Sequence, residues 1–297
     1  MYQLLCLLSG VLLAVVITTN GSLTGFYGAY VGTVIVHIVG TAVAYVAMKS
    51  VKQSWKPARR IPLWMYSGGA MGILTTVFQG VAFGQLGVTA ILALSLFGQT
   101  VTALIVDGCG LFGMERRKVG KGTVIGILVS MCGIVYLLKD AGEMQVYALL
   151  MSIASGVSGV LSRLVNARLA AYTTPIGSSF TNHWVGLVGS VILMLVAEPN
   201  IIGCLQVTDV PNWVYVGGAV GVAMVLLWNI AGQRVSAFQL TMLSFVGQVF
   251  AGIVLDLLVG NGFSQQTFMG GVFVVVGVVL NMLSEQKMKG EIGGSAE

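Results

Sequence analysis

The sequence Leu-Ser-Leu-Phe-Gly-Gln at residues 94–99 recurs as Leu-Ser-Phe-Val-Gly-Gln at residues 243–248, a shift of 149 positions. The same shift carries Trp-Met-Tyr-Ser-Gly-Gly-Ala-Met-Gly at residues 64–72 onto Trp-Val-Tyr-Val-Gly-Gly-Ala-Val-Gly at residues 213–221. Both motifs lie in long apolar stretches. The chain therefore consists of two copies of one membrane unit.

The two copies also match in their earlier parts. A shift of 146 positions places His37 on His183, and these are the only two histidines of the chain. We expect residues 1–142 to form a first five-helix repeat and residues 143–288 a second one. The tail 289–297, which is rich in Gly and Glu, is expected to be disordered.

The composition predicts an all-α membrane protein. Hydrophobic residues make up 56% of the chain, charged residues only 8%, and the mean hydropathy is +0.93, whereas a soluble domain carries about 25% charged residues. Ten apolar runs approach the roughly 20 residues that cross a bilayer as a helix: 3–19, 27–48, 64–83, 88–107, 121–138, 146–167, 176–197, 213–232, 237–257 and 268–284. Five spans per copy is an odd number, so the second copy enters the membrane from the opposite side. Ten transmembrane helices in two inverted five-helix repeats are typical of secondary transporters.

The net charge of +5 is distributed as in a membrane protein. With a cytoplasmic amino terminus and ten spans, every lysine and arginine except Lys139 falls on the cytoplasmic side, as the positive-inside rule requires. Both termini are then cytoplasmic, and the basic charge calls for no nucleic-acid partner. The expected partners are a small-molecule substrate and membrane lipid, and a homodimer is left open.

No residue pattern predicts a cofactor or a catalytic group. The four cysteines show no paired spacing that would indicate a disulfide framework or a zinc site. Gly120-Lys121 lacks both the upstream glycine and the following hydroxyl of a phosphate-binding loop. The energy for transport must then come from an ion gradient, from the substrate's own gradient or from exchange.

The segment from Gly98-Gln99 through Asp107 to the glycine-rich turn at residues 108–113 resembles a known family. It is similar to the inner-membrane exporters of the drug/metabolite transporter superfamily, whose five-helix unit carries an Asn at the end of helix one and a Gly-Gln in helix four. The resemblance covers the whole chain as two fused units, although the turn after Asp256 departs from the pattern. It implies ten helices in inverted halves, export of small metabolites, and a multi-pass protein of the bacterial inner (plasma) membrane.

Two glutamines are expected near the membrane midplane. Gln99 lies about 16 Å into its span at about 1.5 Å per residue, and Gln248 is its repeat partner. Ser95 and Ser244 share a helical face with them by i, i+4 spacing. The glutamines either bind cargo or bridge helices by hydrogen bonds, and the sequence leaves both roles open.

The two histidines are the deep residues that titrate near neutral pH. His37 and His183 each lie about 12 Å from opposite membrane surfaces, so both are candidates for substrate binding or for proton coupling. The alternative is a neutral imidazole bonded to a neighbouring hydroxyl or carbonyl, because burial disfavours the charged form. No carboxylate or thiol lies at matching depth, so we expect no metal site.

Several polar residues fall near the ends of spans. Asp107 and Asp256 either solvate a helix end or act as a gate that pairs with a basic residue. Asn20 and Asn166 either cap helix ends or line the mouths of the cavity. Arg163 lies one turn from a cytoplasmic end, so we expect its guanidinium to reach the membrane surface.

The copies differ where an asymmetric cargo would need an asymmetric pocket. Gln79 stands where the second copy has Trp228, and Asn229 stands where the first copy has Gly80. Trp228 and Trp184 offer flat faces that suit an aromatic or cationic ligand, unless they face lipid. We therefore include these residues among the candidates for substrate binding.

These features predict a secondary active transporter that exports a small organic metabolite or drug-like solute by alternating access, with proton coupling left open. In this hypothesis the two five-helix halves rock about the central site. An intramembrane enzyme would need a nucleophile with a base, or paired carboxylates, at one depth, and no acidic residue lies in the middle of a span. A passive channel or facilitator would usually show charged or carbonyl-rich rings. Both remain weaker alternatives.

Overall fold

The computed structural model describes residues 1–57, 59–113, 116, 120–138, 143–235 and 237–259, with scattered helical residues between 269 and 283. The regular elements of this part are helices, and the only other pairing in it is an isolated bridge between Phe83 and Leu86. The predicted all-α class is therefore confirmed. Much of the expected span 268–284 and the whole tail 289–297 lie outside the described residues.

The helices of the first copy are α1 (Tyr2–Tyr27), α2 (Ala29–Ser50), η1 (Leu63–Tyr66), α3 (Gly68–Ala82), α4 (Val88–Cys109), η2 (Leu111–Gly113) and α5 (Lys121–Leu138). Those of the second copy are α6 (Glu143–Tyr172), α7 (Pro175–Ala197), α8 (Ile201–Leu205), η3 (Asn212–Tyr215), α9 (Val216–Ala231) and α10 (Ala237–Val259). Within the described residues, 6 stretches are long and apolar enough to cross a membrane, namely α1, α2, α4, α6, α7 and η3 with α9. The protein is a multi-pass membrane protein, and the number of ten spans stays a prediction.

Two of the connections between consecutive helices are tight turns. Gly28 alone separates α1 from α2 and adopts φ 77°, a left-handed value that favours glycine because it has no Cβ. Between α6 and α7, the Thr174 hydroxyl accepts a hydrogen bond of 3.0 Å from the Gly177 N–H, and Pro175 occupies the first helical position.

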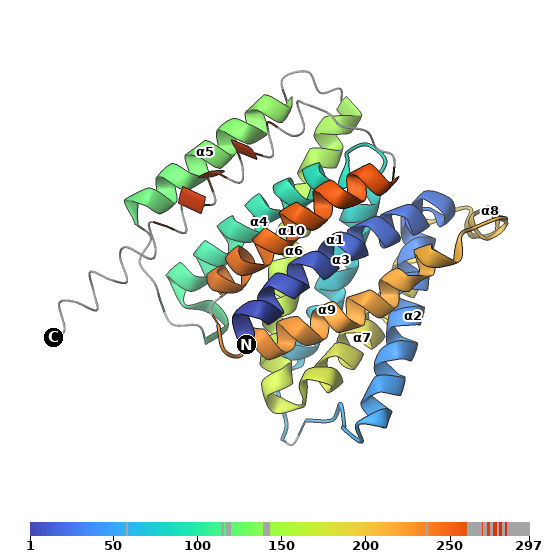
Figure 1. Ribbon diagram of the computed structural model, residues 1–297. Helices are drawn as coiled ribbons and strands as arrows, with labels where there is room; N and C mark the ends of the chain where they lie inside the picture. Colours follow the sequence, from blue (N-terminus) through green and yellow to red (C-terminus); the bar gives the residue numbers. More distant parts are fainter. Residues whose placement is uncertain are drawn as a thin grey trace.

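Eight helices pack as a closed ring in the order α1, α9, α2, α7, α3, α6, α4 and α10, the last of which packs against α1. Figure 1 shows α4, α10, α1 and α9 side by side, with α5 at the edge beside α4. Neighbours in this ring always come from different copies of the repeat. The two copies are therefore interleaved and do not form separate bodies.

Glycines at the crossings explain how the interleaved helices approach so closely. A Cβ added at Gly10 of α1 would overlap the backbone carbonyl oxygen of Ser244 in α10, and a Cβ at Gly156 of α6 would overlap that of Ser95 in α4. Small residues permit this close backbone contact between membrane helices. Because the copies interlock in this way, the predicted rocking of two intact five-helix halves is wrong.

Candidate substrate-binding cavity

A small cavity lies among the helices of the ring, with a volume of about 70 Å³. Pockets for drug-sized ligands usually measure roughly 300–1,000 Å³. The lining residues come from α1, α2, α3, α6, α7 and α9 and are Leu13, Val16, Asn20, Val36, His37, Gly72, Thr75, Thr76, Gln79, Gly159, Ser162, Asn182, His183, Gly217, Gly221, Met224, Val225 and Trp228. The cavity thus brings together five of the residues predicted from the sequence: Asn20, His37, Gln79, His183 and Trp228.

The two histidines meet at this cavity. Their ring centroids are 5.7 Å apart and their planes are inclined by 57°. A Cβ at Gly186 would collide with the His37 ring, and a Cβ at Gly40 would collide with the His183 ring. Each imidazole therefore packs against a glycine on the helix that carries the other imidazole.

The imidazole nitrogens are buried and lack hydrogen-bond partners of standard geometry within the described residues. The backbone of Gly221 is the polar group that approaches His183. The hydroxyl or carbonyl bond expected for a purely structural histidine is therefore not formed by His37. Buried polar atoms without partners are costly, so these nitrogens are available to a bound solute or to water.

Arg163 is the functional candidate that the sequence reasoning missed. Its side chain is only 4% exposed, so the expectation that it reaches the membrane surface is wrong. The reason is the length of α6, which continues to Tyr172 and places Arg163 about 13 Å from its end at about 1.5 Å per residue. The one available signal was a charged residue inside an otherwise apolar span, which is expensive unless it has partners.

The guanidinium of Arg163 joins four helices. Its Nη1 donates a hydrogen bond of 3.0 Å to Gln99 Oε1 in α4, and its Nη2 donates to the Thr241 hydroxyl in α10. Its Cζ lies 5.6 Å from the ring centroid of Trp228 in α9. The buried carboxylate of Asp107 lies close enough to interact with this charge. Arg163 itself does not line the central cavity, whereas Trp228 does.

The glutamines and serines predicted for the central site lie elsewhere. Gln99 donates 3.3 Å to the Ser95 hydroxyl, and the Ser244 hydroxyl lies 2.9 Å from that of Ser9. Gln248 is 1% exposed, and neither polar atom of its side chain has a partner in the described part of the chain. Their helical faces pack against the opposite copy at the glycine crossings. The prediction that these residues line the central cavity is therefore wrong.

Two further candidates point away from the cavity. Trp184 is 49% exposed although it follows His183 directly, because one residue rotates a helix position by about 100°. The Asn229 amide donates a hydrogen bond of 3.0 Å to the Pro175 carbonyl and is absent from the lining. Trp184 therefore lies on the outer face of the helix ring, and Asn229 links α9 to the start of α7 by its hydrogen bond.

Three of the four predicted gate residues, Asp107, Asn20 and Asn166, are buried. Asp107 is 3% exposed, so solvation of the helix end is wrong for this residue; Asp256 lies in α10, but its side chain falls outside the described part. Asn20 and Asn166 cap no helix, because α1 and α6 extend well beyond them. Asn20 lines the cavity. Asn166 donates 2.7 Å to Asn182 Oδ1.

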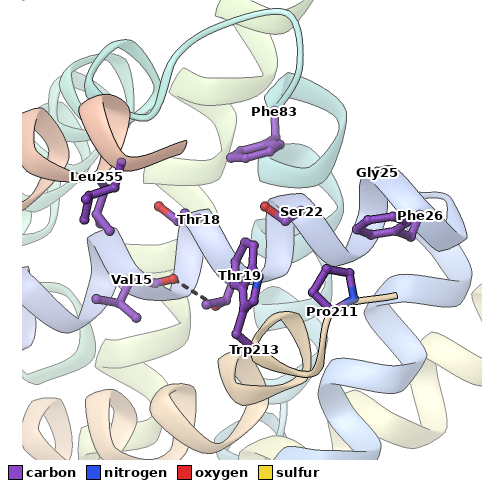
Figure 2. A pocket seen from close by; sticks show the side chains of 11 residues that line it. Val15, Thr18, Thr19, Ser22, Gly25, Phe26, Phe83, Pro211, Trp213 and Leu255 are labelled. Atoms are coloured by element: carbon purple, nitrogen blue, oxygen red, sulfur yellow. Dashed lines mark hydrogen bonds between the residues drawn. The ribbon is translucent and has the colours of Figure 1, made fainter. Parts of the chain in front are cut away.

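A second, wider cavity of about 720 Å³ lies on the other face of α1. Figure 2 shows Phe83, Trp213 and Leu255 around it, with Thr18 and Ser22 on α1. The repeat-related place beside Trp64 is filled by the chain itself, since Trp64 contacts Phe112 at a centroid distance of 5.9 Å and Arg168 donates to the Phe112 carbonyl. Phe112 of η2 thus packs against Trp64, whereas a cavity lies beside Trp213 and α1.

Comparisons with known proteins agree with this architecture. The family described as "Putative inner membrane exporter, YdcZ" matches residues 1–136 and again residues 147–280. A solved structure titled "Crystal structure of protein" shares 19% sequence identity at a TM-score of 0.64, over 96% of this chain and 97% of that one, which shows a common fold. None of the curated proteins matches the chain. With two successive matches that span nearly its whole length, the chain belongs to the YdcZ family of inner membrane exporters within the drug/metabolite transporter superfamily.

Proposed function

We propose that this protein is a secondary active transporter that exports a small organic solute by alternating access, and that the cavity between His37 and His183 is its substrate site. The observation that carries the proposal is the position of this cavity. Its walls come from both copies of the repeat, and its two histidines are repeat partners. In transporters built from inverted repeats, substrate binds at the interface between the repeats.

The interleaved ring suggests which parts move. Helices α1, α2, α9 and α10 pack on one side of the cavity, and α3, α4, α6 and α7 pack on the other. These two groups, each drawn from both copies, rock about the site in place of the two halves of the sequence. Because the cavity measures only about 70 Å³, these two groups must separate to admit a drug-sized solute.

Transport is tested with the purified protein in proteoliposomes. Saturable uptake that is accelerated by the same solute on the opposite side is the result expected of alternating access, because loaded carriers return faster than empty ones. The solutes come from a screen across metabolite classes for compounds that raise the melting temperature, since a ligand stabilises the state that binds it. Flux that rises linearly with concentration, without acceleration from the opposite side, would instead indicate a channel.

The predicted orientation is open to direct measurement. With ten inverted spans, Lys56 in the connection after α2 lies in the cytoplasm, and Thr208 in the connection after α8 lies outside. In a variant without Cys109, Cys132 and the half-exposed Cys204, a cysteine at position 56 is expected to react with an impermeant maleimide only in inverted vesicles. A cysteine at position 208 is expected to react only in intact cells. Labelling of both positions from one side would contradict the topology.

Proton coupling, if transport uses it, falls to the histidines, because the described lining of the cavity contains no other group that titrates near neutral pH. The double variant His37→Gln/His183→Gln is therefore expected to lose uptake driven by a pH gradient and to retain part of its substrate exchange. Both activities are measured in the same proteoliposomes. An unchanged dependence on the pH gradient would remove the histidines from coupling and favour exchange or uniport.

A further inference from the structure

The lining of the central cavity differs systematically between positions that the repeat relates. Ser162 stands where the other copy has Val16, Asn182 where it has Val36, and Thr76 where it has Val225. Thr75 likewise corresponds to Met224, and Gln79 to Trp228. In each of these five pairs the polar member lies on α3, α6 or α7, and the apolar member lies on α1, α2 or α9. Asn20 on α1 is a polar lining residue outside this pattern, and its repeat partner is Asn166.

These residues form two walls that face one another. The polar wall consists of Thr75, Thr76, Gln79, Ser162 and Asn182, and the apolar wall consists of Val16, Val36, Met224, Val225 and Trp228. The histidine pair belongs to both copies equally and lies between the walls. Apart from Asn20 and the two histidines, the polar lining residues of the described part therefore lie on one side of the cavity.

The polar wall keeps hydrogen-bonding capacity for a guest. The Asn182 carbonyl oxygen already accepts from Asn166 at 2.7 Å, so its amide nitrogen remains as a donor. The Thr76 hydroxyl donates to the Gly72 carbonyl at 3.1 Å and can still accept. In the described part of the chain no hydrogen bond engages the Gln79 amide, which offers both a donor and an acceptor.

The cavity lacks a counter-ion. None of the described lining residues is an Asp, Glu, Lys or Arg. The charged residue nearest in sequence to a lining residue, Arg163, does not line the cavity and is already bonded to Gln99 and Thr241. Trp228, whose ring centroid lies 5.6 Å from the Arg163 Cζ, does line it. A guest with a net charge would be buried there without a partner, which is strongly unfavourable.

We infer that the cargo is an uncharged amphipathic solute that binds in one orientation, with its hydrogen-bonding end on the polar wall and its apolar body on the apolar wall. This inference rests on the proposed function, since it names the class of substrate for the same site. A carboxamide or alcohol on a compact aliphatic or aromatic body has this chemistry. A carboxylate or ammonium on the same body does not.

Matched solutes test the charge requirement. Two series keep one body and change only the polar end: benzamide, benzoate and benzylammonium, and isobutyramide, isobutyrate and isobutylammonium. In a thermal-shift titration of the full-length protein at pH 7, at least one amide is expected to raise the melting temperature saturably, and its charged partners are expected to leave it unchanged. A charged member that binds more tightly than its amide, or no amide that binds at all, overturns the inference.

The walls themselves are tested by moving one hydroxyl across the cavity. Thr76→Val removes it from the polar wall and is expected to weaken binding of the active amide about tenfold, as loss of one buried hydrogen bond does. Adding Val225→Thr returns the same hydroxyl on the apolar wall and is not expected to restore affinity. Thr33→Val is the matched control, because the Thr33 hydroxyl is also bonded within its helix, to Ala29 at 2.7 Å, but lies outside the cavity.

Restored affinity in the double variant would show that only the composition of the cavity matters and would overturn the two-wall assignment. The remaining outcomes separate this inference from the transport proposal. If amides bind with the expected effects of the variants but show no saturable flux, the inference about the site holds and the transport proposal is wrong. If charged solutes show saturable flux that Thr76→Val does not change, the inference about the site is wrong and the transport proposal holds.

Discussion

Gly10→Ala is expected to destabilise the folded protein strongly, whereas Gly25→Ala in the same helix is expected to be tolerated. A Cβ at position 10 would overlap the backbone carbonyl of Ser244 at the crossing of α1 and α10. Backbone atoms cannot rotate away as a flexible side chain can, so the helices must separate. Overpacking costs about 1–3 kcal/mol and sometimes more, and we expect the upper end or beyond. Thermal unfolding followed by size-exclusion chromatography in detergent measures the loss.

Gly25 supplies the control because a Cβ there would meet nothing within 4 Å. Alanine at this position is expected to leave stability unchanged or raise it by about 0.4–1 kcal/mol, through a smaller loss of backbone entropy on folding. Gly156→Ala, at the related crossing of α6 and α4, should repeat the result for Gly10. Equal stability of the Gly10→Ala and Gly25→Ala variants would mean that these helices do not touch at the glycines.

Arg163→Met is expected to lower the free energy of unfolding by roughly 3–5 kcal/mol, the usual consequence of removing one partner from a buried charged network. The change would leave Gln99 and Thr241 without their donor and Asp107 without the neighbouring charge. Lysine at this position keeps the charge but cannot reproduce the planar fork that reaches two helices. We therefore expect only partial recovery in Arg163→Lys, measured by the same thermal unfolding.

Arg234→Met is the matched control for this prediction. Arg234 also lies over an aromatic ring, that of Tyr2 at 5.9 Å from the centroid, but it is exposed. Cation–π contacts at exposed sites contribute about 0.5–1 kcal/mol, so this loss should be several times smaller. Comparable losses in the two variants would show that burial and the hydrogen bonds of Arg163 add little.

The sequence could predict the class of the fold because that class depends on composition and on the length of apolar runs. The all-helical membrane protein and the exporter family followed from these runs and from the motif between Gly98 and Gly113. The ends of the helices could be predicted less well from the sequence. The span expected at residues 3–19 is α1, Tyr2–Tyr27, because Thr, Asn, Ser and Gly continue a buried helix where they would end an exposed one.

The position of each side chain around its helix could not be read from the sequence. Depth along a helix follows from counting residues, and it placed His183 and Gln99 alike near the midplane. The neighbour that a helical face contacts depends on how the other helices pack. For this reason His183 lies in the cavity, whereas Gln99 lies at a helix crossing. The burial of Arg163 was missed for the same reason, since its partners come from three other helices.

The alternating order of the ring has a consequence for biosynthesis. When the first copy has left the ribosome, each of its ring helices still lacks both of its neighbours, because these belong to residues 143–259. At roughly 5–20 residues per second, the second copy follows on the order of ten seconds later. During this interval His37, Gln99 and the glycine faces meet lipid or an insertion factor in place of protein. We therefore expect the nascent chain to be most vulnerable to quality-control proteases midway through its own synthesis, because the ring can close only after its last helices are made.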